Sequence, residues 1–350
     1  MRKLATIQKV KQILEIKDSD FIELIRFEDI GWQCVAKKNE FSIGDLGVYF
    51  EVDSFLPLSN QNFEFLHKTS YRKMFTGEEG YRLRTIKMRG SLSQGLFLPL
   101  VSFPELTNSN VLEDVTEKLN VIKWEREPSI SMSGDIIADY PSHTPKSNQP
   151  RIQNCMEYFE LYKDVEFERT MKLEGVSTSY HVNNGEVGAS SHNTSYARNE
   201  RFSPWVHFET LGLEKILLDL KRNITIQGEY MGPKLQGNIE NLLEKDFFTY
   251  NIWDIDKYDW LSAPERYSLI GEINQNIAGD KKLSHVPILD KCIKIFSVVD
   301  NIEDLLKMAE GPSISAKLRE GDVYKSLEKI NGEYIQFKVI SNKYLLKEKD

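Results

Sequence analysis

The stretch EFERTMKLEGVSTSYHVNNGEVGASS, residues 166–191, reads as two strands joined by a turn. Asn184-Gly185 is typical of a tight β-hairpin. Lys172 lies in the first strand, two residues before Glu174 and three before Gly175. A lysine normally goes to the surface as a solvated cation. In a strand that otherwise reads as buried, it is a candidate for chemistry.

The composition is that of a water-soluble globular protein. The chain has 350 residues, 40% hydrophobic and 28% charged, which is enough for two domains. It contains neither a membrane-length apolar run nor a signal peptide. The three cysteines are far apart in sequence, which argues against a disulfide framework and indicates a reducing, cytoplasmic compartment. The net charge of −8 argues against nonspecific coating of nucleic acid, although a local basic groove remains compatible with it.

The two halves of the chain have different patterns. Short strands and glycine turns in residues 1–117 predict a small barrel or sandwich. Residues 118–150 are rich in Pro and Ser and predict a linker. Residues 151–350 mix strand pairs with helices, as in "ETLGLEKILLDLKR", so the predicted fold class is α+β. A basic strand in the first region is either a phosphate-backbone track or a solvated face; its residues are Arg82, Arg84, Lys87 and Arg89.

Lysine chemistry requires a neutral amine. Burial and a neighbouring cation both lower a lysine pKa, and the neutral amine can attack carbonyl carbon or phosphorus. Glu174 beside Lys172 is suited to a metal or a ribose, and Gly175 allows a ligand close to the backbone. Taken alone, K-x-E-G is a weak pattern.

Four further patterns follow in order: "QGEYMG" with Glu229, the aromatic strand "FFTYNIWDID" with Asp254, "LREGDVYKSL" with Glu320, and "YIQFKVISNKYLLK" with Lys338. Together with K-x-E-G, this order resembles the covalent nucleotidyltransferase superfamily of ATP-dependent RNA and DNA ligases and mRNA capping enzymes, over roughly residues 150 to 350. In the first half, "GWQCVAKKNEFSIGDLGVYFEVDSFLP" and "RTIKMRGSLSQGL" look like the N-terminal OB-fold module of one RNA ligase family. In that family the OB module precedes the ligase domain, whereas DNA ligases and capping enzymes typically place it afterwards.

The resemblance implies an OB-like barrel followed by a nucleotidyltransferase domain of antiparallel sheets flanked by helices. It also implies RNA repair in three steps. Lys172 would attack the α-phosphorus of ATP, AMP would pass to an RNA 5′-phosphate, and a 3′-OH would seal the break. Mg²⁺ or Mn²⁺ suits the acidic residues, and the implied metal site consists of Glu174, Asp254 and Glu320. The RNA, or an RNA/DNA hybrid nick, would lie on the OB module, and a monomer would suffice for one nick.

The resemblance implies further roles at the nucleotide. Lys338 would contact the α-phosphate and keep Lys172 neutral by repulsion. Tyr250 or Phe248 would stack on adenine, with Val323 on the other face. The remaining expected ATP-binding residues are Arg151, Gln153, the backbone of Met171, Glu229 and Arg198.

The sequence departs from the family pattern at three places. Glu174 stands where the family usually has Asp, and Gln336 stands where many relatives have the first lysine of a K-x-K pair. An Arg-Asn pair normally follows the nucleophile motif; His192-Asn193 occupies that position, but Arg198-Asn199 matches by residue type and is preferred here.

Each of these positions also has an ordinary interpretation. Singly, Glu174 and Glu229 fit surface carboxylates, Phe248 and Tyr250 fit core aromatics, and Lys338 fits an edge-strand lysine. Three functions therefore stand beside an RNA ligase: a DNA ligase, a guanylyltransferase, and a noncatalytic RNA-binding protein on a ligase scaffold.

Overall fold

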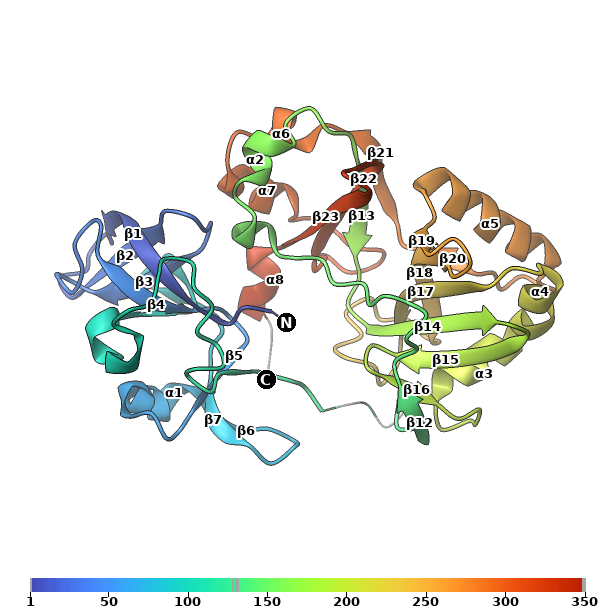
Figure 1. Cartoon of the computed structure of the whole chain (residues 1–350), viewed down its shortest axis with the longest axis horizontal. Coiled ribbons are helices and arrows are strands. Elements are labelled where there is room, and N and C mark those ends of the chain that lie inside the picture. Colours follow the sequence, from blue (N-terminus) through green and yellow to red (C-terminus); the bar gives the residue numbers. More distant parts are fainter. Residues whose placement is uncertain (1, 128, 130–131, 348–350) are drawn as a thin grey trace. The chain divides into compact units, whose positions relative to one another are not determined.

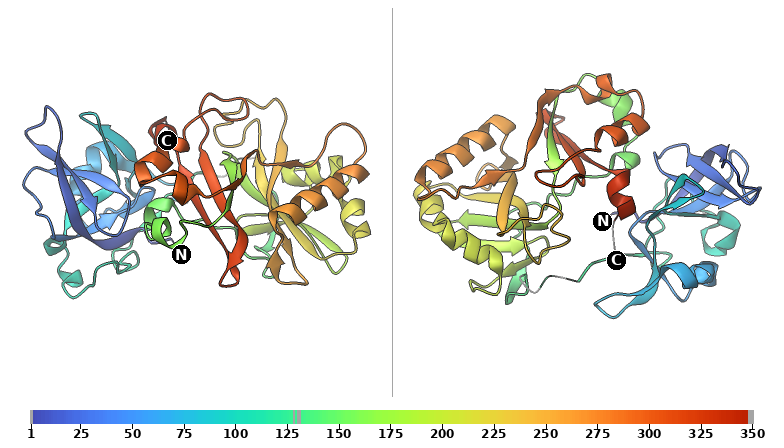
Figure 2. Two further views of the ribbon diagram at one scale, coloured as in Figure 1. Left: turned by 90° about the horizontal axis from the view of Figure 1, so that it is seen from above. Right: turned by 180° about the vertical axis from the view of Figure 1, so that it is seen from behind.

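The computed structural model describes residues 2–127, 129 and 132–347. It divides into two compact units, which can be followed in Figures 1 and 2. Of the described residues, the first contains 2–127, 152–158 and 345–347, and the second contains 129, 132–151 and 159–344. The predicted boundaries are residues 117 and 150; the structure places the division at residue 127, inside the predicted linker, and assigns two later short segments to the first unit.

The first unit is built from antiparallel strands. One sheet has the order β10-β4-β1-β2-β3, a second has the order β11-β5-β7-β6, and β8 and β9 form a hairpin. Their bounds are β1 Ala5–Glu15, β2 Ile22–Phe27, β3 Gln33–Lys37, β4 Leu46–Phe50, β5 Ser54–Pro57, β6 Tyr71–Lys73, β7 Glu79–Arg82, β8 Thr85–Met88, β9 Ser91–Gln94, β10 Leu96–Pro99 and β11 Ile122–Lys123. Short helical turns complete the unit: η1 Gln61–Leu66, α1 His67–Ser70, η2 Leu100–Ser102, η3 Pro104–Leu106 and η4 Ile152–Asn154.

Two parts of the predicted linker take part in sheets. Strand β11 pairs with β5 in the first unit, where Val121 is also buried. Strand β12 (Ile136–Asp139) pairs with β16 (Thr194–Tyr196) in the second unit. Their hydrogen bonds tie the start and the middle of the Pro- and Ser-rich segment to folded structure.

An eight-stranded sheet organises the second unit. Its order is β12-β16-β15-β14-β17-β18-β19, and β20 pairs with β18. Its remaining strands are β14 Val176–Asn183, β15 Glu186–Ser191, β17 Ile224–Met231, β18 Asp246–Asp254, β19 Asp259–Trp260 and β20 Ser284–His285. The predicted hairpin is present, since β14 and β15 pair antiparallel and Asn184 and Gly185 have φ values of 51° and 83°.

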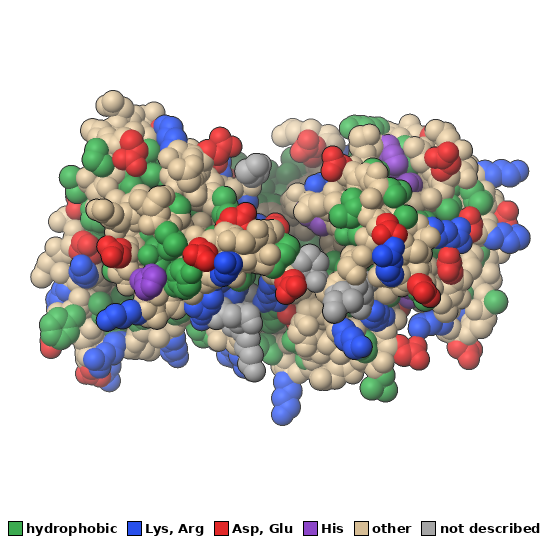
Figure 3. Space-filling view, turned by 90° about the horizontal axis from the view of Figure 1, so that it is seen from below, with side chains coloured by type: hydrophobic (Ala, Val, Ile, Leu, Met, Phe, Trp, Pro, Cys, Tyr) green, Lys and Arg blue, Asp and Glu red, His purple; other side chains and the backbone are tan. Residues whose placement is uncertain are grey.

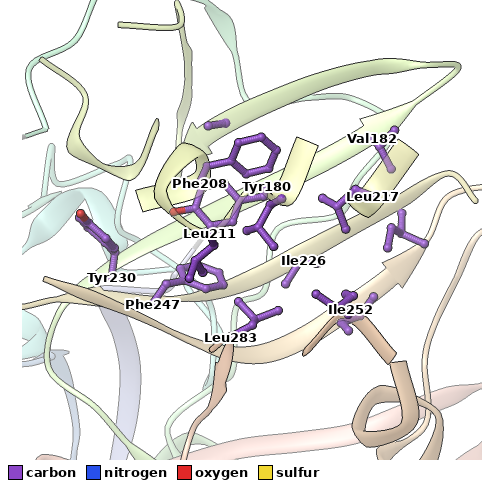
Figure 4. Close-up of a cluster of buried hydrophobic side chains, with 14 of the residues drawn as sticks. Tyr180, Val182, Phe208, Leu211, Leu217, Ile226, Tyr230, Phe247, Ile252 and Leu283 are labelled. Atoms are coloured by element: carbon purple, nitrogen blue, oxygen red, sulfur yellow. The ribbon is translucent and has the colours of Figure 1, made fainter. Parts of the chain in front are cut away.

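Three helices cover one face of this sheet: α3 Ser203–Thr210, α4 Leu213–Asp219 and α5 Ala263–Asn276 (Figures 1 and 2). Alternate residues of the strands point towards them, including Tyr180, Val182, Ile226 and Ile252 (Figure 4). These side chains pack with Phe208 and other apolar helix residues. The opposite face of the sheet is therefore available for polar groups.

A smaller antiparallel sheet completes the second unit, with the order β21-β13-β22-β23. Its strands are β13 Phe167–Lys172, β21 Ile288–Ile293, β22 Gly321–Ile330 and β23 Glu333–Ile340. The helices near it are α2 Tyr158–Leu161, α6 Ile295–Val298, α7 Ile302–Met308 and α8 Asn342–Lys347. The mixture of antiparallel sheets and helices is the predicted α+β class.

Acidic and basic side chains are mixed over the face shown in Figure 3. None of the helices within the described ranges, 2–127 and 132–347, is long and apolar enough to cross a bilayer. The three cysteines are free thiols: Cys34 and Cys155 are buried, and Cys292 is exposed.

Candidate active site

A pocket lies between the two sheets of the second unit. One wall comes from β13, β22 and β23, and the other comes from β14, β17 and β18. Residues 147–149, which belong to the predicted linker, also line it. The lining side chains that the argument uses are Ser147, Gln149, Glu168, Thr170, Met171, Lys172, Ser177, His192, Glu229, Tyr250, Asn251, Val323, Lys325, Gln336 and Lys338.

Lys172 is the last residue of β13 and faces this pocket. Its Nζ donates a hydrogen bond of 2.9 Å to Oε2 of Glu320, which directly precedes β22. The side chains are 24% and 15% exposed, so the ion pair is shielded from bulk solvent. The register places Lys172 opposite Gly321, and this pairing brings Glu320 beside the amine.

The charge on Lys172 differs from the prediction. Burial lowers the pKa of Lys172, but Glu320 and Glu229 outweigh burial and raise it above the ordinary value. The ligand-free site therefore favours the protonated ammonium, whereas the predicted attack on phosphorus requires the neutral amine. Repulsion from Arg151 lowers the pKa of Lys172 but does not overcome the two adjacent carboxylates.

Glu229 completes this charged group. It lies on β17 opposite Ser177 of β14, and it lines the same pocket. Burial raises the pKa of Glu229 to about 7; Lys172 opposes this rise and Glu320 adds to it. A carboxylate that is costly to ionise next to a reactive lysine is typical of a functional site rather than of a stabilising ion pair.

Glu174 lies close to this group, although it does not line the pocket. It follows the end of β13, is buried, and packs against Gly237, where a built Cβ would lie 3.1 Å from its Oε2. Its charge also raises the pKa of Glu229. Within residues 2–127 and 132–347, no three His, Cys, Asp or Glu side chains are arranged to hold a metal ion directly.

Asp254 is not part of the site, so its prediction as a metal ligand is wrong. It pairs with Ile224, at the end of β17 remote from Glu229. Its carboxylate accepts a 2.9 Å hydrogen bond from Arg222 and another from the backbone of Lys257. Burial raises the pKa of Asp254, but these partners outweigh burial and lower it. The prediction located the aromatic strand β18 correctly, but Asp254 lies at the end of that strand remote from Glu229.

Two further cations are brought to the lysine. Lys338 lines the pocket from β23, opposite Val323. Its backbone N–H donates to the Pro150 carbonyl at 2.9 Å, and Arg151 forms a parallel bridge with Lys338. Arg151 is close enough to Lys172 to lower its pKa. Both positions are consistent with the predicted phosphate contacts.

Gln336 accepts a 3.3 Å hydrogen bond from Gln149. The strap of residues 147–149 therefore reaches the position where many relatives carry a lysine.

The expected base-binding residues lie partly in place. Tyr250 and Val323 line the pocket from different sheets, and the Tyr250 hydroxyl is 2.9 Å from Ser177 Oγ. Phe248 instead packs into a small apolar cluster with Met171 and does not line the pocket. The Met171 N–H donates to the Pro287 carbonyl at 2.9 Å, so it is not free to bind a base edge.

Gln153 and Arg198 were predicted at the nucleotide, but neither is among the residues that line the pocket. Gln153 is fully buried in the first unit, and its carbonyl accepts from Gly31 at 2.7 Å. Arg198 forms surface ion pairs of 2.7 and 2.8 Å with Glu209 and Glu214. The alternative, His192, lines the pocket, so position along the chain was the better guide than residue type.

The four predicted RNA-binding cations do not share one strand. Arg82 ends β7, is only 3% exposed, and lies over the Trp124 ring at 5.1 Å, so it is a core residue and its prediction as an RNA contact is wrong. Lys87 and Arg89 are exposed on the β8–β9 hairpin, and Arg84 is half-buried before it. These three remain candidates for RNA contact.

Comparison with known proteins follows the same division. Residues 4–100 match an OB-fold domain, and residues 165–344 match the RNA ligase family. No curated protein sequence matches. Solved structures of Naegleria gruberi RNA ligase do: an apo alanine variant is 40% identical, with 99% of this chain and 98% of that chain covered and a TM-score of 0.90.

The chain belongs to the RNA ligase family. A Naegleria gruberi RNA ligase variant solved with ATP and Mn is 39% identical with a TM-score of 0.90, and each chain is covered to 99%. The Naegleria enzyme with PPi is 40% identical, with the same coverage and TM-score. The predicted family, enzyme class and fold are thereby confirmed: this RNA ligase has an N-terminal OB fold and a ligase domain of antiparallel sheets with helices.

Sequence reasoning missed several pocket residues of this RNA ligase: Ser147, Gln149, Glu168, Thr170, Asn251 and Lys325. One signal was available, since Glu168 and Thr170 precede Lys172 by four and two residues on the same strand. Side chains two apart in a strand share a face. The linker residues gave no such signal, because an irregular segment has no period.

Proposed function

We propose that this RNA ligase uses ATP to form a covalent Lys172–AMP intermediate and then joins RNA 3′-OH and 5′-phosphate ends. The observation that carries the proposal is the Lys172 amine, which faces a pocket at 2.9 Å from Glu320 and is flanked by Glu229 and Lys338. A shielded lysine among acids and cations is suited to attack on a bound nucleotide.

In the first step the Lys172 Nζ forms a bond to the α-phosphorus of ATP. The bond from that phosphorus to the bridging oxygen breaks, and pyrophosphate leaves. Because the resting amine is an ammonium, one proton must leave Nζ first. Glu320 already accepts a hydrogen bond from that group, so it is placed to receive the proton. Lys338 and Arg151 supply positive charge for the phosphate oxygens.

Glu174, Glu229 and Glu320 fit a divalent cation held largely through its water molecules. They influence one another electrostatically, yet they do not form a direct ligand triad. Mg²⁺ usually keeps several waters, and Mn²⁺ has similar ligand preferences. When bound, such an ion would neutralise phosphate charge and compete with Lys172 for the acids. Competition of that kind would lower the lysine pKa and favour the neutral amine.

The later steps use the RNA. The adenylyl group passes to an RNA 5′-phosphate, and a 3′-OH then attacks that phosphate and releases AMP. We propose that Lys87, Arg89 and Arg84 of the OB unit contact the RNA backbone, whether the nick is all RNA or an RNA/DNA hybrid. One nick occupies one site, so a monomer is sufficient. Free buried thiols are compatible with a reducing intracellular compartment.

The test is incubation with α-labelled ATP and Mg²⁺ or Mn²⁺. We expect a covalent label on the wild-type protein and none on Lys172→Ala. The same preparations are then assayed on matched RNA, DNA and hybrid nicks with 3′-OH and 5′-phosphate ends. Label from GTP alone, or sealing of all-DNA nicks alone, would instead identify a guanylyltransferase or a DNA ligase. Salt-sensitive RNA binding without any label would indicate a noncatalytic protein.

A further inference from the structure

The pocket extends along one face of β13. Lys172, Thr170 and Glu168 alternate on this face, and all three line the pocket. Four strand residues span about 13 Å, which is comparable to the length of a nucleoside monophosphate. The register opposite them on β22 runs Gly321, Val323 and Lys325. The pocket therefore has a lysine end and a Glu168 end.

The two ends differ in character. Lys172, Lys338 and Arg151 supply three cations at one end, where phosphate belongs, whereas the cations at the other end, Lys325 and Arg266, are bound to Asn251 and Glu168. Val323, opposite Thr170, provides an apolar surface between the two ends, and the Tyr250 ring lines the pocket with its hydroxyl at Ser177. A nucleotide whose phosphate lies at Lys172 thus extends its base towards Glu168, and polar atoms at that end would meet the edge of the base.

Most polar groups at the Glu168 end already have partners. Lys325 donates a 3.1 Å hydrogen bond to Asn251 Oδ1, and its ammonium lies 4.8 Å from the centre of the Tyr334 ring. Asn251 in turn donates to Ser147 Oγ at 3.0 Å. Lys325 and Asn251 therefore hold each other and the 147–149 strap.

Glu168 is different. It is 3% exposed, and its Oε2 accepts a hydrogen bond from Arg266 of α5. Its Oε1 is buried and has no hydrogen-bond partner among the described residues. Among the described residues that line the pocket, Glu168 is the one whose side chain has a buried polar atom without a partner. A buried acceptor without a donor costs free energy, so this oxygen is suited to a donor carried by a ligand.

Arg266 fixes the orientation of that carboxylate. It is fully buried and does not line the pocket, so it lies behind Glu168. Its Nε donates to His285 Nε2 at 2.9 Å. Burial and the Arg266 charge lower the pKa of His285 to about 4, so the imidazole is a neutral acceptor at physiological pH. Arg266 is thus held between Glu168 and His285, and it binds Oε2 of a residue that lines the pocket while Oε1 is left without a donor.

We propose that Glu168 selects the nucleobase, with Oε1 accepting a hydrogen bond from the exocyclic 6-amine of adenine. Guanine carries an acceptor oxygen at that position, which a carboxylate would repel. Arg266 acts as a positioning residue for Glu168. The inference rests on the proposed use of ATP, and it names the residue that makes ATP rather than GTP the substrate.

The test compares covalent labelling of the wild type and Glu168→Gln by α-labelled ATP and GTP. In the variant Arg266 would hold the amide oxygen and leave the amide NH₂ facing the pocket, where it suits a guanine oxygen. A hydrogen bond to a charged group contributes about 1.5–3 kcal/mol, so the ratio of ATP to GTP labelling rates should fall roughly 10- to 100-fold. Asp254→Asn is the matched control, because Asp254 is a buried, arginine-paired acid outside the pocket and should leave the ratio unchanged.

A second measurement does not depend on the stability of the variant. Purine riboside triphosphate lacks the 6-amine, and the wild type should label from it roughly 10- to 100-fold more slowly than from ATP. Equal rates for these two nucleotides, or a Glu168→Gln ratio within twofold of wild type, would overturn the proposal. Failure of the wild type to label from ATP would instead remove the proposed function, so the two failures are distinguishable.

Discussion

Replacing Glu320 with glutamine should make Lys172 much more nucleophilic in the ligand-free enzyme. The substitution keeps an oxygen near the amine but removes the charge that lies 2.9 Å away. Burial, which opposes the ammonium, then acts with less compensation, because Glu229 is the remaining carboxylate that raises the lysine pKa. The neutral fraction of Lys172 should therefore rise at any pH below its pKa.

The size of the effect follows from the geometry. An opposite charge within hydrogen-bond distance changes a protonation equilibrium by about 1–3 pH units, each equal to 1.36 kcal/mol. The two side chains are 24% and 15% exposed, so water screens part of the interaction. We therefore take the lower part of that range and expect the neutral amine fraction to increase roughly 10- to 100-fold.

The assay measures acylation of Lys172 by an amine-selective reagent, without nucleotide or metal. Mass spectrometry of the peptide containing Lys172 gives the initial rate at several pH values. Because only the neutral amine reacts, the rate reports the neutral fraction. The two rates should differ most near neutral pH and converge in strong base, which separates a change in charge from a change in access.

Glu310→Gln is the control. Glu310 pairs with Lys343 at 2.6 Å, but the Lys343 side chain is 65% exposed. In this variant the acylation rate of Lys343 should change only a few-fold, because solvated ion pairs contribute little. The acylation rate of Lys172 should stay the same. An increase of less than threefold for Lys172 in Glu320→Gln would refute the conclusion that this ion pair sets the resting charge of the nucleophile.

Three further outcomes are expected. Burial raises the pKa of Glu229 from an ordinary 4.5 to about 7, so the folded state binds more protons than the unfolded state between these pH values and loses stability as pH rises. Glu229→Gln should therefore increase the free energy of unfolding at pH 8 by up to about 3 kcal/mol. Denaturant titration should show this gain at pH 8 and no gain below pH 4.5. In Gly321→Ala the added Cβ would lie 2.0 Å from the Val339 carbonyl oxygen, so the free energy of unfolding should fall by about 1–3 kcal/mol and covalent labelling by ATP should be lost. In the control Gly271→Ala the added Cβ has no atom within 4 Å, so stability and labelling should both be retained. Arg198→Ala should retain ATP labelling within twofold and lose less than about 1 kcal/mol of stability, and a severe labelling defect would restore Arg198 to the site.

Local sequence was sufficient for the hairpin at Asn184-Gly185, the strand that carries Lys172, and the α+β mixture. These depend on turn chemistry and on residue alternation, which act between near neighbours. The order of the motifs was sufficient for the family, because five spaced patterns rarely coincide by chance. The same order located Glu229, Glu320 and Lys338, which the structure places around Lys172.

Tertiary structure alone decided which ends of the strands meet and what charge the nucleophile carries. Asp254 and Tyr250 lie four residues apart on β18, yet only Tyr250 reaches the pocket, because register and strand length determine which residues approach Lys172. The protonation of Lys172 depends on burial and on an acid 148 residues away, so no local pattern contains it. The unpaired oxygen of Glu168 is likewise a property of packing, since it depends on what surrounds the carboxylate in space.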